Sequence, residues 1–231
     1  MSQLAPETSL GMRILLQGEQ SIYNWILADI ATGKLVSGDR LVTTHLASCY
    51  QTSINPVREA LKQLEGEGFV TFQKNSGARV ASFEYATMRE VFEILQLLEP
   101  YFLSWYAGHC TPESLACLAD IQEQLRALDI RDSAGLRDLD TAFHWEMYRH
   151  HYNASALRLW KNKKLILQAL HGDLPVCEKR FKATLDEHDH ILYLLNAGDD
   201  ESAVRALTKH VISGGDYWSS VITDQLRALS A

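Results

Sequence analysis

The strongest hydrophobic pattern in the chain lies in residues 53–72. Its apolar side chains recur at spacings of three and four, which places them on one face of a helix: Val57, Ala60, Leu61 and Leu64. Ser53 precedes this helix and can cap it, because its hydroxyl can accept a free backbone N–H of the first turn. Two glycines follow the last apolar position, and residues 69–72 have the composition of a strand. The pattern predicts a short helix with one buried face and an exposed N-terminal end.

Shorter patterns precede this helix. Residues 19–32 have helical spacing and are followed by a glycine, whereas residues 35–41 have the composition of a turn and a short extended segment. Thr43 or Thr44 can then cap a further short helix. Residues 1–16 have no regular period, so we expect a flexible arm there.

A predicted hairpin completes the N-terminal domain. Residues 69–73 and 78–81 flank a turn that contains asparagine and glycine. Three helices followed by a hairpin is the order of a winged helix-turn-helix, which we predict for residues 17–82. The exposed end of its last helix carries Ser53, Ile54, Asn55 and Arg58. A helix end of this kind enters the major groove of DNA in such domains.

Everything after residue 82 has helical periodicity. The predicted helices are 88–109, 111–128, 132–152, 153–171, 176–196, 199–212 and 217–229. Gly214 and Gly215 are expected to separate the last two, and short loops favour antiparallel neighbours. The predicted fold class is mostly α, with an N-terminal winged helix-turn-helix that includes a small β-hairpin. Residues 83–231 would form an all-α antiparallel bundle of six or seven helices.

Charge is unevenly distributed along the chain. The net charge is −7, yet residues 1–82 hold seven basic and seven acidic side chains, so residues 83–231 carry the whole excess. Because DNA repels an acidic surface, DNA contacts must come from the N-terminal domain. The sequence has no apolar run of about 18 residues and no signal-peptide pattern, and its cysteines have no metal or disulfide spacing. We expect a cytoplasmic protein with free thiols and no membrane partner.

Polar side chains interrupt the apolar faces of three predicted bundle helices. Asp140 and His144 are four residues apart among apolar positions of one helix, and His188 and His210 fall on the inward faces of two later helices. A buried carboxylate needs a compensating charge, and one carboxylate with three imidazoles suits a divalent transition metal. A hydrogen-bonded Asp–His pair with two unrelated core histidines is the alternative that the spacing leaves open.

Several of these segments resemble the signature of the GntR family of bacterial transcription regulators. The N-terminal matches are Pro56-Val-Arg-Glu-Ala-Leu61, Leu64-Glu65, Glu67-Gly68 and Asn75-x-Gly77-x-x-Val80. The C-terminal part resembles the family's FadR-type helical effector domain. The matches there are Asp140-x-x-Phe-His144, Glu187-His188-x-x-Ile191-Leu192 and His210.

The resemblance implies a function and the residues that perform it. It implies a repressor of transcription that binds an operator in double-stranded DNA. Because one neutral winged helix offers few phosphate contacts, we predict a homodimer that binds an inverted repeat. The implied DNA-binding residues are Thr44, Ser53, Ile54, Asn55, Arg58, Asn75 and Gly77. The resemblance also implies a small carboxylic-acid effector beside a divalent metal, which would be Zn, Ni or Mn. The implied metal ligands are Asp140, His144, His188 and His210.

Two positions depart from the family pattern. Ile54 stands where the family commonly has an arginine that contacts a base, which leaves Arg58 as the hydrogen-bond donor. Leu95 stands where the family usually has an arginine near the effector, so Arg180, Lys179 or the metal would have to supply that charge. We expect Arg180, Trp145 and Leu95 to line the effector site.

An enzyme is the alternative function. A metal with open coordination positions could activate water for a hydrolase or a lyase. Glu146 and Glu187 are the acid–base candidates near the predicted ligands, and no nucleophile–base pair accompanies them in the sequence. We therefore predict a ligand-responsive, metal-binding transcription regulator and not an enzyme.

Overall fold

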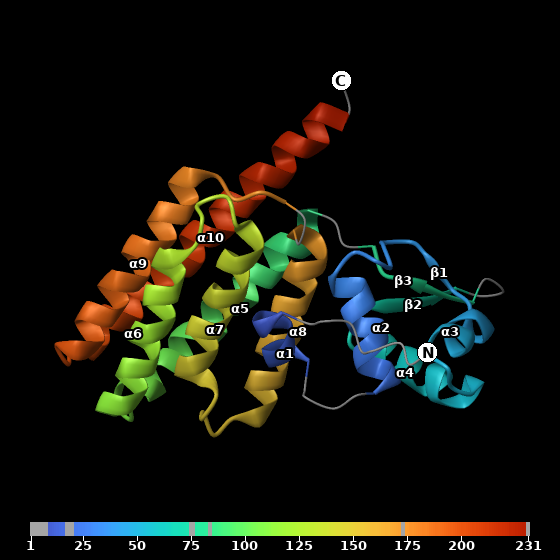
Figure 1. Ribbon diagram of the computed structural model, residues 1–231, viewed down its shortest axis with the longest axis horizontal. Coiled ribbons are helices and arrows are strands. Elements are labelled where there is room, and N and C mark those ends of the chain that lie inside the picture. Colours follow the sequence, from blue (N-terminus) through green and yellow to red (C-terminus); the bar gives the residue numbers. More distant parts are fainter. Residues whose placement is uncertain (1–8, 17–20, 74–76, 83–84, 172–173, 230–231) are drawn as a thin grey trace. The chain divides into compact units, whose positions relative to one another are not determined.

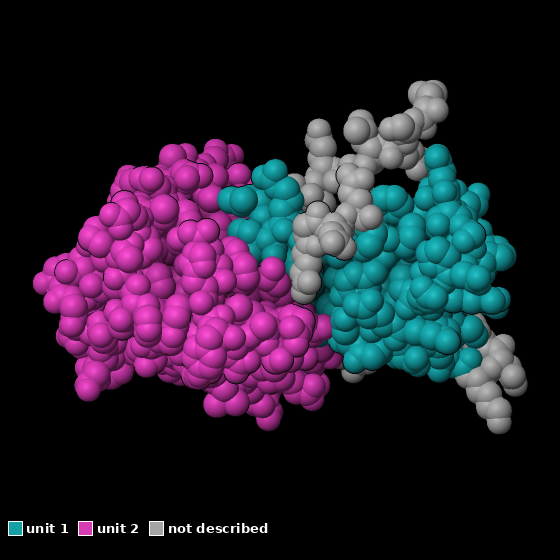
Figure 2. All heavy atoms as spheres, turned by 90° about the horizontal axis from the view of Figure 1, so that it is seen from below, with its two compact units in different colours: residues 1–84, 164–172 teal, residues 85–163, 173–231 magenta. Residues whose placement is uncertain are grey.

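The computed structural model describes residues 9–16, 21–73, 77–82, 85–171 and 174–229. The chain divides into two compact units (Figure 2). The first consists of residues 1–84 and 164–172, and the second of residues 85–163 and 173–231. None of the described helices combines the length and apolar character needed to cross a membrane.

Three helices form the core of the first unit (Figure 1): α2 (Ile22–Ala31), α3 (Thr43–Cys49) and α4 (Ile54–Gly66). The apolar stripe predicted for α4 is buried, and Val57, Leu61 and Leu64 are fully enclosed. α4 contacts both α2 and α3, and Ile26 and Ile30 of α2 are also buried. Burial of each such side chain contributes about 1.5–3 kcal/mol, so the stripe fixes which face of α4 remains exposed.

A small antiparallel sheet accompanies these helices. It contains β1 (Arg40–Leu41), β2 (Val70–Gln73) and β3 (Gly77–Val80), in the order β1-β3-β2. Gly68 has φ of +86°, a left-handed conformation that favours glycine and allows the chain to leave α4 for β2. The predicted winged helix-turn-helix is confirmed. The short extended segment before α3 is β1, which adds a strand to the predicted hairpin of β2 and β3.

The buried carboxylate of Asp29 connects the end of α2 to the end of α3 by a hydrogen bond. Asp29 of α2 accepts a hydrogen bond from the Tyr50 hydroxyl at 2.6 Å, and Tyr50 is the C-cap of α3. Lys34 Nζ donates to the same carboxylate at 2.9 Å. The Lys34 side chain is exposed and contributes little, whereas only 7% of the Asp29 side chain is exposed. The Asp29–Tyr50 bond is therefore the stronger restraint on the two helices.

The N-terminal segment differs from its prediction. Residues 10–15 form helix α1 (Leu10–Leu15), whose N-cap Ser9 accepts a hydrogen bond from the Met12 backbone N–H. Met12 and Leu15 are buried. The expected flexible arm over residues 1–16 is therefore wrong for residues 10–15, while residues 1–8 lie outside the described part. A helix of 6 residues offers too few apolar positions for a period to be recognised in the sequence.

Two helix caps in the structure differ from their predictions. Ser53 occupies the N-cap position of α4, but its side chain makes no capping hydrogen bond. α3 begins at Thr43 after Val42, so neither Thr43 nor Thr44 is its cap. The position of Ser53 is thus as predicted without its hydrogen bond, whereas α3 begins one residue earlier than expected, a difference common at helix ends.

Six helices follow residue 84 in the described part of the chain (Figure 1), and all belong to the second unit apart from residues 164–171. They are α5 (Tyr85–Ala107), α6 (Pro112–Ala127), α7 (Ser133–Tyr148), α8 (Ala154–His171), α9 (Glu178–Asn196) and α10 (Asp200–Leu229). α10 contacts α5 and α9, and α6 contacts α7 and α9. Two of these helices have capped N-terminal ends, since Thr111 forms a capping box with Ser114 and Asp132 accepts a hydrogen bond from the Gly135 N–H. The predicted all-α bundle is confirmed.

One predicted break in the bundle is absent. α10 continues through Gly214 and Gly215 to Leu229, so the segments predicted as 199–212 and 217–229 are one helix. A Cβ atom at position 215 would lie 3.0 Å from Phe92 Cγ. Gly215 therefore permits close approach of α10 to α5 and does not end the helix.

Candidate functional site

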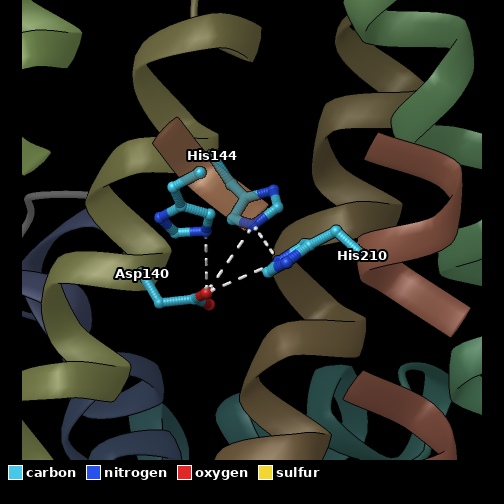
Figure 3. A group of neighbouring side chains, drawn as sticks. Asp140, His144 and His210 are labelled. Carbon is cyan, nitrogen blue, oxygen red and sulfur yellow. Dashed lines mark hydrogen bonds and ion pairs between the residues drawn. The ribbon is translucent and has the colours of Figure 1, made fainter. Parts of the chain in front are cut away.

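The four predicted metal ligands converge in the bundle. Asp140 and His144 come from successive turns of α7, His188 comes from α9 and His210 from α10. One ligand atom of each lies within 4.8 Å of the other three. Figure 3 shows the side chains of Asp140, His144 and His210 directed toward one another. Packing of α7, α9 and α10 thus brings together residues that are up to 70 positions apart in the sequence.

The distances between these atoms suit a single ion. Asp140 Oδ1 lies 3.7 Å from His144 Nε2 and 3.5 Å from His188 Nε2. It lies 3.8 Å from His210 Nε2, and the Nε2 atoms of His144 and His210 are 3.1 Å apart. Ligand atoms about 2.0–2.2 Å from one transition-metal ion are separated from each other by about 3–3.6 Å. All four atoms can therefore reach the same ion after small side-chain shifts.

The surroundings of His188 indicate whether these four residues fit a metal. Its side chain is 0% exposed and stacks on the Phe143 ring. Neither of its ring nitrogens has a hydrogen-bond partner among the described residues. A buried polar group without a hydrogen bond costs about 1–3 kcal/mol. A metal at the cluster would satisfy Nε2, so this donor set fits the predicted ion.

A second carboxylate, Glu99 of α5, lies beside His144 and was not among the predicted residues. Its Oε2 is 3.1 Å from His144 Nδ1. Its other oxygen accepts a hydrogen bond from Trp160 Nε1 at 2.8 Å, and the Tyr148 hydroxyl donates to Oε2 at 3.3 Å. Glu99 is only 2% exposed. Its spacing of four residues from the apolar Leu95 was the available signal in the sequence.

A third carboxylate contacts His210. Glu187 Oε2 lies 2.8 Å from His210 Nδ1 and 3.0 Å from Arg180 Nη2. Its Oε1 accepts hydrogen bonds from the Ser213 hydroxyl at 3.0 Å and from Arg180 Nη1 at 3.2 Å. Arg180 Nη1 also donates to Ser213 Oγ at 2.7 Å. The guanidinium that was expected to meet an effector is thus held by Glu187 and Ser213.

The charges of these groups favour a divalent cation. Asp140, Glu99 and Glu187 bring three negative charges to the site, and Arg180 brings one positive charge. With all three imidazoles neutral, as metal binding requires, two negative charges remain among these four groups, and a divalent cation would balance them. Such compensation is needed because an isolated charge held away from water costs several kcal/mol.

Burial and charge act in opposite directions on the imidazoles. Burial lowers the pKa of His188 to about 3, which Asp140 opposes only in part. Burial also lowers the pKa of His210, against the contact with Glu187. At His144 the effect of burial is outweighed by the charges of Glu99 and Asp140, which raise its pKa to about 9. His188 and His210 are therefore neutral near pH 7, the form of imidazole that binds a metal, whereas His144 is protonated without a metal and would lose its proton to bind one.

A cavity of about 510 Å³ is lined by α9 and α10 beside His210. Its walls include Glu187 and His210 together with the cationic side chains of Arg205 and Lys209. This volume is in the range of small-molecule sites. The carboxylate that contacts His210 is therefore also part of a cavity wall.

The other two predicted effector residues lie in different surroundings. Trp145 stacks on Trp160 with 5.9 Å between ring centroids, and Lys161 Nζ lies 4.2 Å from the centre of its ring. Because Trp160 donates to Glu99, Trp145 is linked to the cluster through that carboxylate. Leu95 is 2% exposed and belongs to the core.

The predicted DNA contacts are exposed wherever they are described. This holds for Thr44 in α3, for Ser53, Ile54, Asn55 and Arg58 at the start of α4, and for Gly77 in β3. Asn75 lies outside the described residues. Arg58 makes no hydrogen bond or ion pair with any residue that the structure describes. Its guanidinium is therefore available to an external partner.

Two protein families match adjacent parts of the chain. The family described as bacterial regulatory proteins, gntR family, matches residues 19–80. The family described as the FCD domain matches residues 90–213.

Named relatives cover most of the chain. The probable D-xylose utilization operon transcriptional repressor of Paenarthrobacter nicotinovorans is 27% identical over 194 residues, which is 82% of this chain and 84% of that protein. The gluconate operon transcriptional repressor of Bacillus licheniformis is 23% identical over 184 residues, 77% of this chain and 75% of that protein. Among solved structures, E. coli McbR/YncC has a TM-score of 0.72 at 20% identity, over 95% of this chain and 99% of that one. The structural likeness supports the fold.

Proposed function

The chain belongs to the GntR family of bacterial transcription regulators, with an FCD domain as its C-terminal part, and on this basis we propose that it is a metabolite-controlled repressor. Its winged helix-turn-helix, within residues 17–82, binds an inverted-repeat operator as part of a homodimer. Its helical domain, within residues 83–231, binds a small carboxylic acid beside a divalent metal. Occupancy of that site changes the affinity for DNA.

The convergence of Asp140, His144, His188 and His210 carries the proposal. Four donor atoms from three helices lie within 4.8 Å of one another, and His188 has no hydrogen-bond partner among the described residues. A bound Zn²⁺, Ni²⁺ or Mn²⁺ supplies a Lewis acid that attracts an anionic ligand. The protein holds the donors and shields the site from water, and Arg180 neutralises Glu187.

The proposal that the N-terminal domain binds DNA is supported by α4 and by the distribution of charge. Burial of one face of α4 leaves Ser53, Ile54, Asn55 and Arg58 exposed at its N-terminal end. Ser53 makes no capping bond, so its hydroxyl can meet a phosphate. Ile54 can pack only on an apolar group such as the methyl of thymine, which leaves base recognition by hydrogen bonds to Asn55 and Arg58. Since the N-terminal domain is neutral overall, two copies are needed for tight binding.

Binding explains the helical site better than a hydrolase or lyase reaction does. Glu187 would be the nearest general base, but it is engaged by His210, Arg180 and Ser213. Glu146 is paired with Arg149 at 2.9 Å. A general base needs a free oxygen within hydrogen-bond reach of the proton that it removes.

The names of two relatives suggest the chemical class of the effector. One is named for the use of D-xylose and the other for gluconate, which are a sugar and a sugar acid. A sugar acid would offer a carboxylate to the metal and hydroxyl groups to the polar residues around it. We therefore propose a small hydroxylated carboxylic acid as the effector.

Selection of DNA from a random-sequence pool by the purified protein tests the function. We expect enrichment of a short inverted repeat, with binding that weakens as salt rises. Metal-loaded protein is then titrated with sugar acids while its binding to the selected DNA is measured by fluorescence anisotropy. Failure to enrich any sequence would overturn the operator-binding proposal. Operator binding that no small carboxylic acid changes would overturn the proposed effector class.

A further inference from the structure

In two of the three predicted ligand imidazoles, the ring nitrogen that faces away from the metal site contacts a carboxylate. The Nδ1 atom of His144 faces Glu99 at 3.1 Å, and the Nδ1 atom of His210 faces Glu187 at 2.8 Å. In each ring the opposite atom, Nε2, is directed toward Asp140. The same arrangement thus occurs twice, on carboxylates from two different helices.

We infer that Glu99 and Glu187 are positioning residues of the metal centre, each of which orients one imidazole so that its Nε2 can bind the ion. This inference rests on the proposed metal site. A carboxylate that accepts the Nδ1–H of a ligand imidazole fixes both the ring orientation and the tautomer. It also makes Nε2 a better electron-pair donor, which strengthens binding of a cation.

The surroundings of Glu99 support an orienting role. Hydrogen bonds from Trp160 Nε1 and the Tyr148 hydroxyl fix the carboxylate, and the side chain is enclosed in the bundle. A buried carboxylate without such partners would be costly. These bonds fix Glu99 beside His144, whose Nδ1 also lies 3.2 Å from the Tyr148 hydroxyl.

Glu187 is the more accessible of the two. One quarter of its side chain is exposed, and it lines the cavity beside Arg205 and Lys209. Arg180 and Ser213 hold both of its oxygens in place. Replacing Glu187 therefore changes the support of His210 with less risk to folding than replacing Glu99.

Metal titration of the full-length protein tests the inference. Zn²⁺ affinity is measured by competition with a chromogenic chelator, and the coordination geometry is followed by the visible absorption of bound Co²⁺. The variants are Glu99→Gln and Glu187→Gln. Matched controls are Glu93→Gln on α5 and Glu178→Gln on α9, two exposed carboxylates that pair with Arg89 and Lys182. Circular dichroism establishes that each variant is folded.

We expect Glu99→Gln and Glu187→Gln each to weaken metal binding by about 10- to 100-fold and to change the Co²⁺ spectrum. The control variants should retain the affinity and the spectrum of the wild type. If Glu99→Gln does not fold, Glu99→Asp takes its place in the same two measurements. The role of Glu187 is decided by Glu187→Gln independently of that result. Wild-type affinity and spectrum in folded variants would overturn the inference and leave the metal site standing. A wild type that binds no metal would overturn the metal site itself.

Discussion

Replacement of Arg58 by alanine tests how α4 reads DNA. Arg58 lies one turn into α4, at an exposed position outside the buried stripe, and makes no hydrogen bond or ion pair with the described part of the protein. Its removal should therefore leave the fold intact, because an exposed side chain without partners contributes little to stability. Any loss of DNA binding can then be assigned to the contact with DNA.

The expected loss follows from the contact that an arginine can make. A bidentate hydrogen bond to guanine contributes about 1–3 kcal/mol of discrimination. That corresponds to about a 5- to 150-fold weaker binding for each recognition helix. A dimer that reads two half-sites would lose roughly twice this free energy, about 2–6 kcal/mol.

The assay is fluorescence anisotropy with the selected operator and with random DNA at matched salt. Lys62→Ala is the control on the same helix, since Lys62 is an exposed cation one turn further from the N-terminal end. We expect Arg58→Ala to lose affinity for the operator and to retain affinity for random DNA, and Arg58→Lys to restore little. An equal loss on both DNAs would make Arg58 a phosphate contact. Unchanged operator binding would refute its role in recognition.

Four further outcomes are expected. Asp29→Asn should lower the free energy of unfolding by about 1.5–3 kcal/mol, because it weakens the charged hydrogen bond with Tyr50; an unchanged urea midpoint would contradict this. Gly215→Ala should be less stable than Gly214→Ala, because the new Cβ would lie 3.0 Å from Phe92 at position 215 and no closer than 3.9 Å to any neighbour at position 214; equal melting temperatures would remove the packing role of Gly215. Light scattering should give twice the chain mass, and a monomer that still protects a single half-site at nanomolar concentration would contradict the dimer. Chelator should lower the melting temperature of the wild type and added Zn²⁺ should restore it, whereas an unmoved melting curve would mean that no bound metal stabilises the fold.

The sequence predicted the parts of the structure that depend on local patterns. The buried face of α4 followed from Val57, Leu61 and Leu64, because helical periodicity determines which residues share a face. Asp140 and His144 could be paired for the same reason. Placing His188 and His210 beside them needed the family resemblance, since periodicity shows that a side chain points inward but not which helix it meets.

Features that depend on contacts between distant segments were missed. Glu99 and His144 are 45 positions apart, and only the packing of α5 against α7 brings them together. Gly215 was interpreted as a helix end because glycine has a low helix propensity. Its actual surroundings include Phe92 of α5, which no local pattern in α10 could reveal.

Metal content provides the most direct test of the central claim, that Asp140, His144, His188 and His210 form a metal centre. Wild type, His188→Ala and His210→Ala are purified identically, and their metals are quantified by elemental analysis. We predict about one Zn, Ni or Mn per wild-type chain and little or none in either variant, with operator binding retained in all three proteins. Both variants should also melt at a lower temperature, because the remaining donors stay buried without a partner. A wild type without stoichiometric metal, or a His188→Ala variant with the full amount, would contradict the claim and leave the four residues as a hydrogen-bonded core cluster.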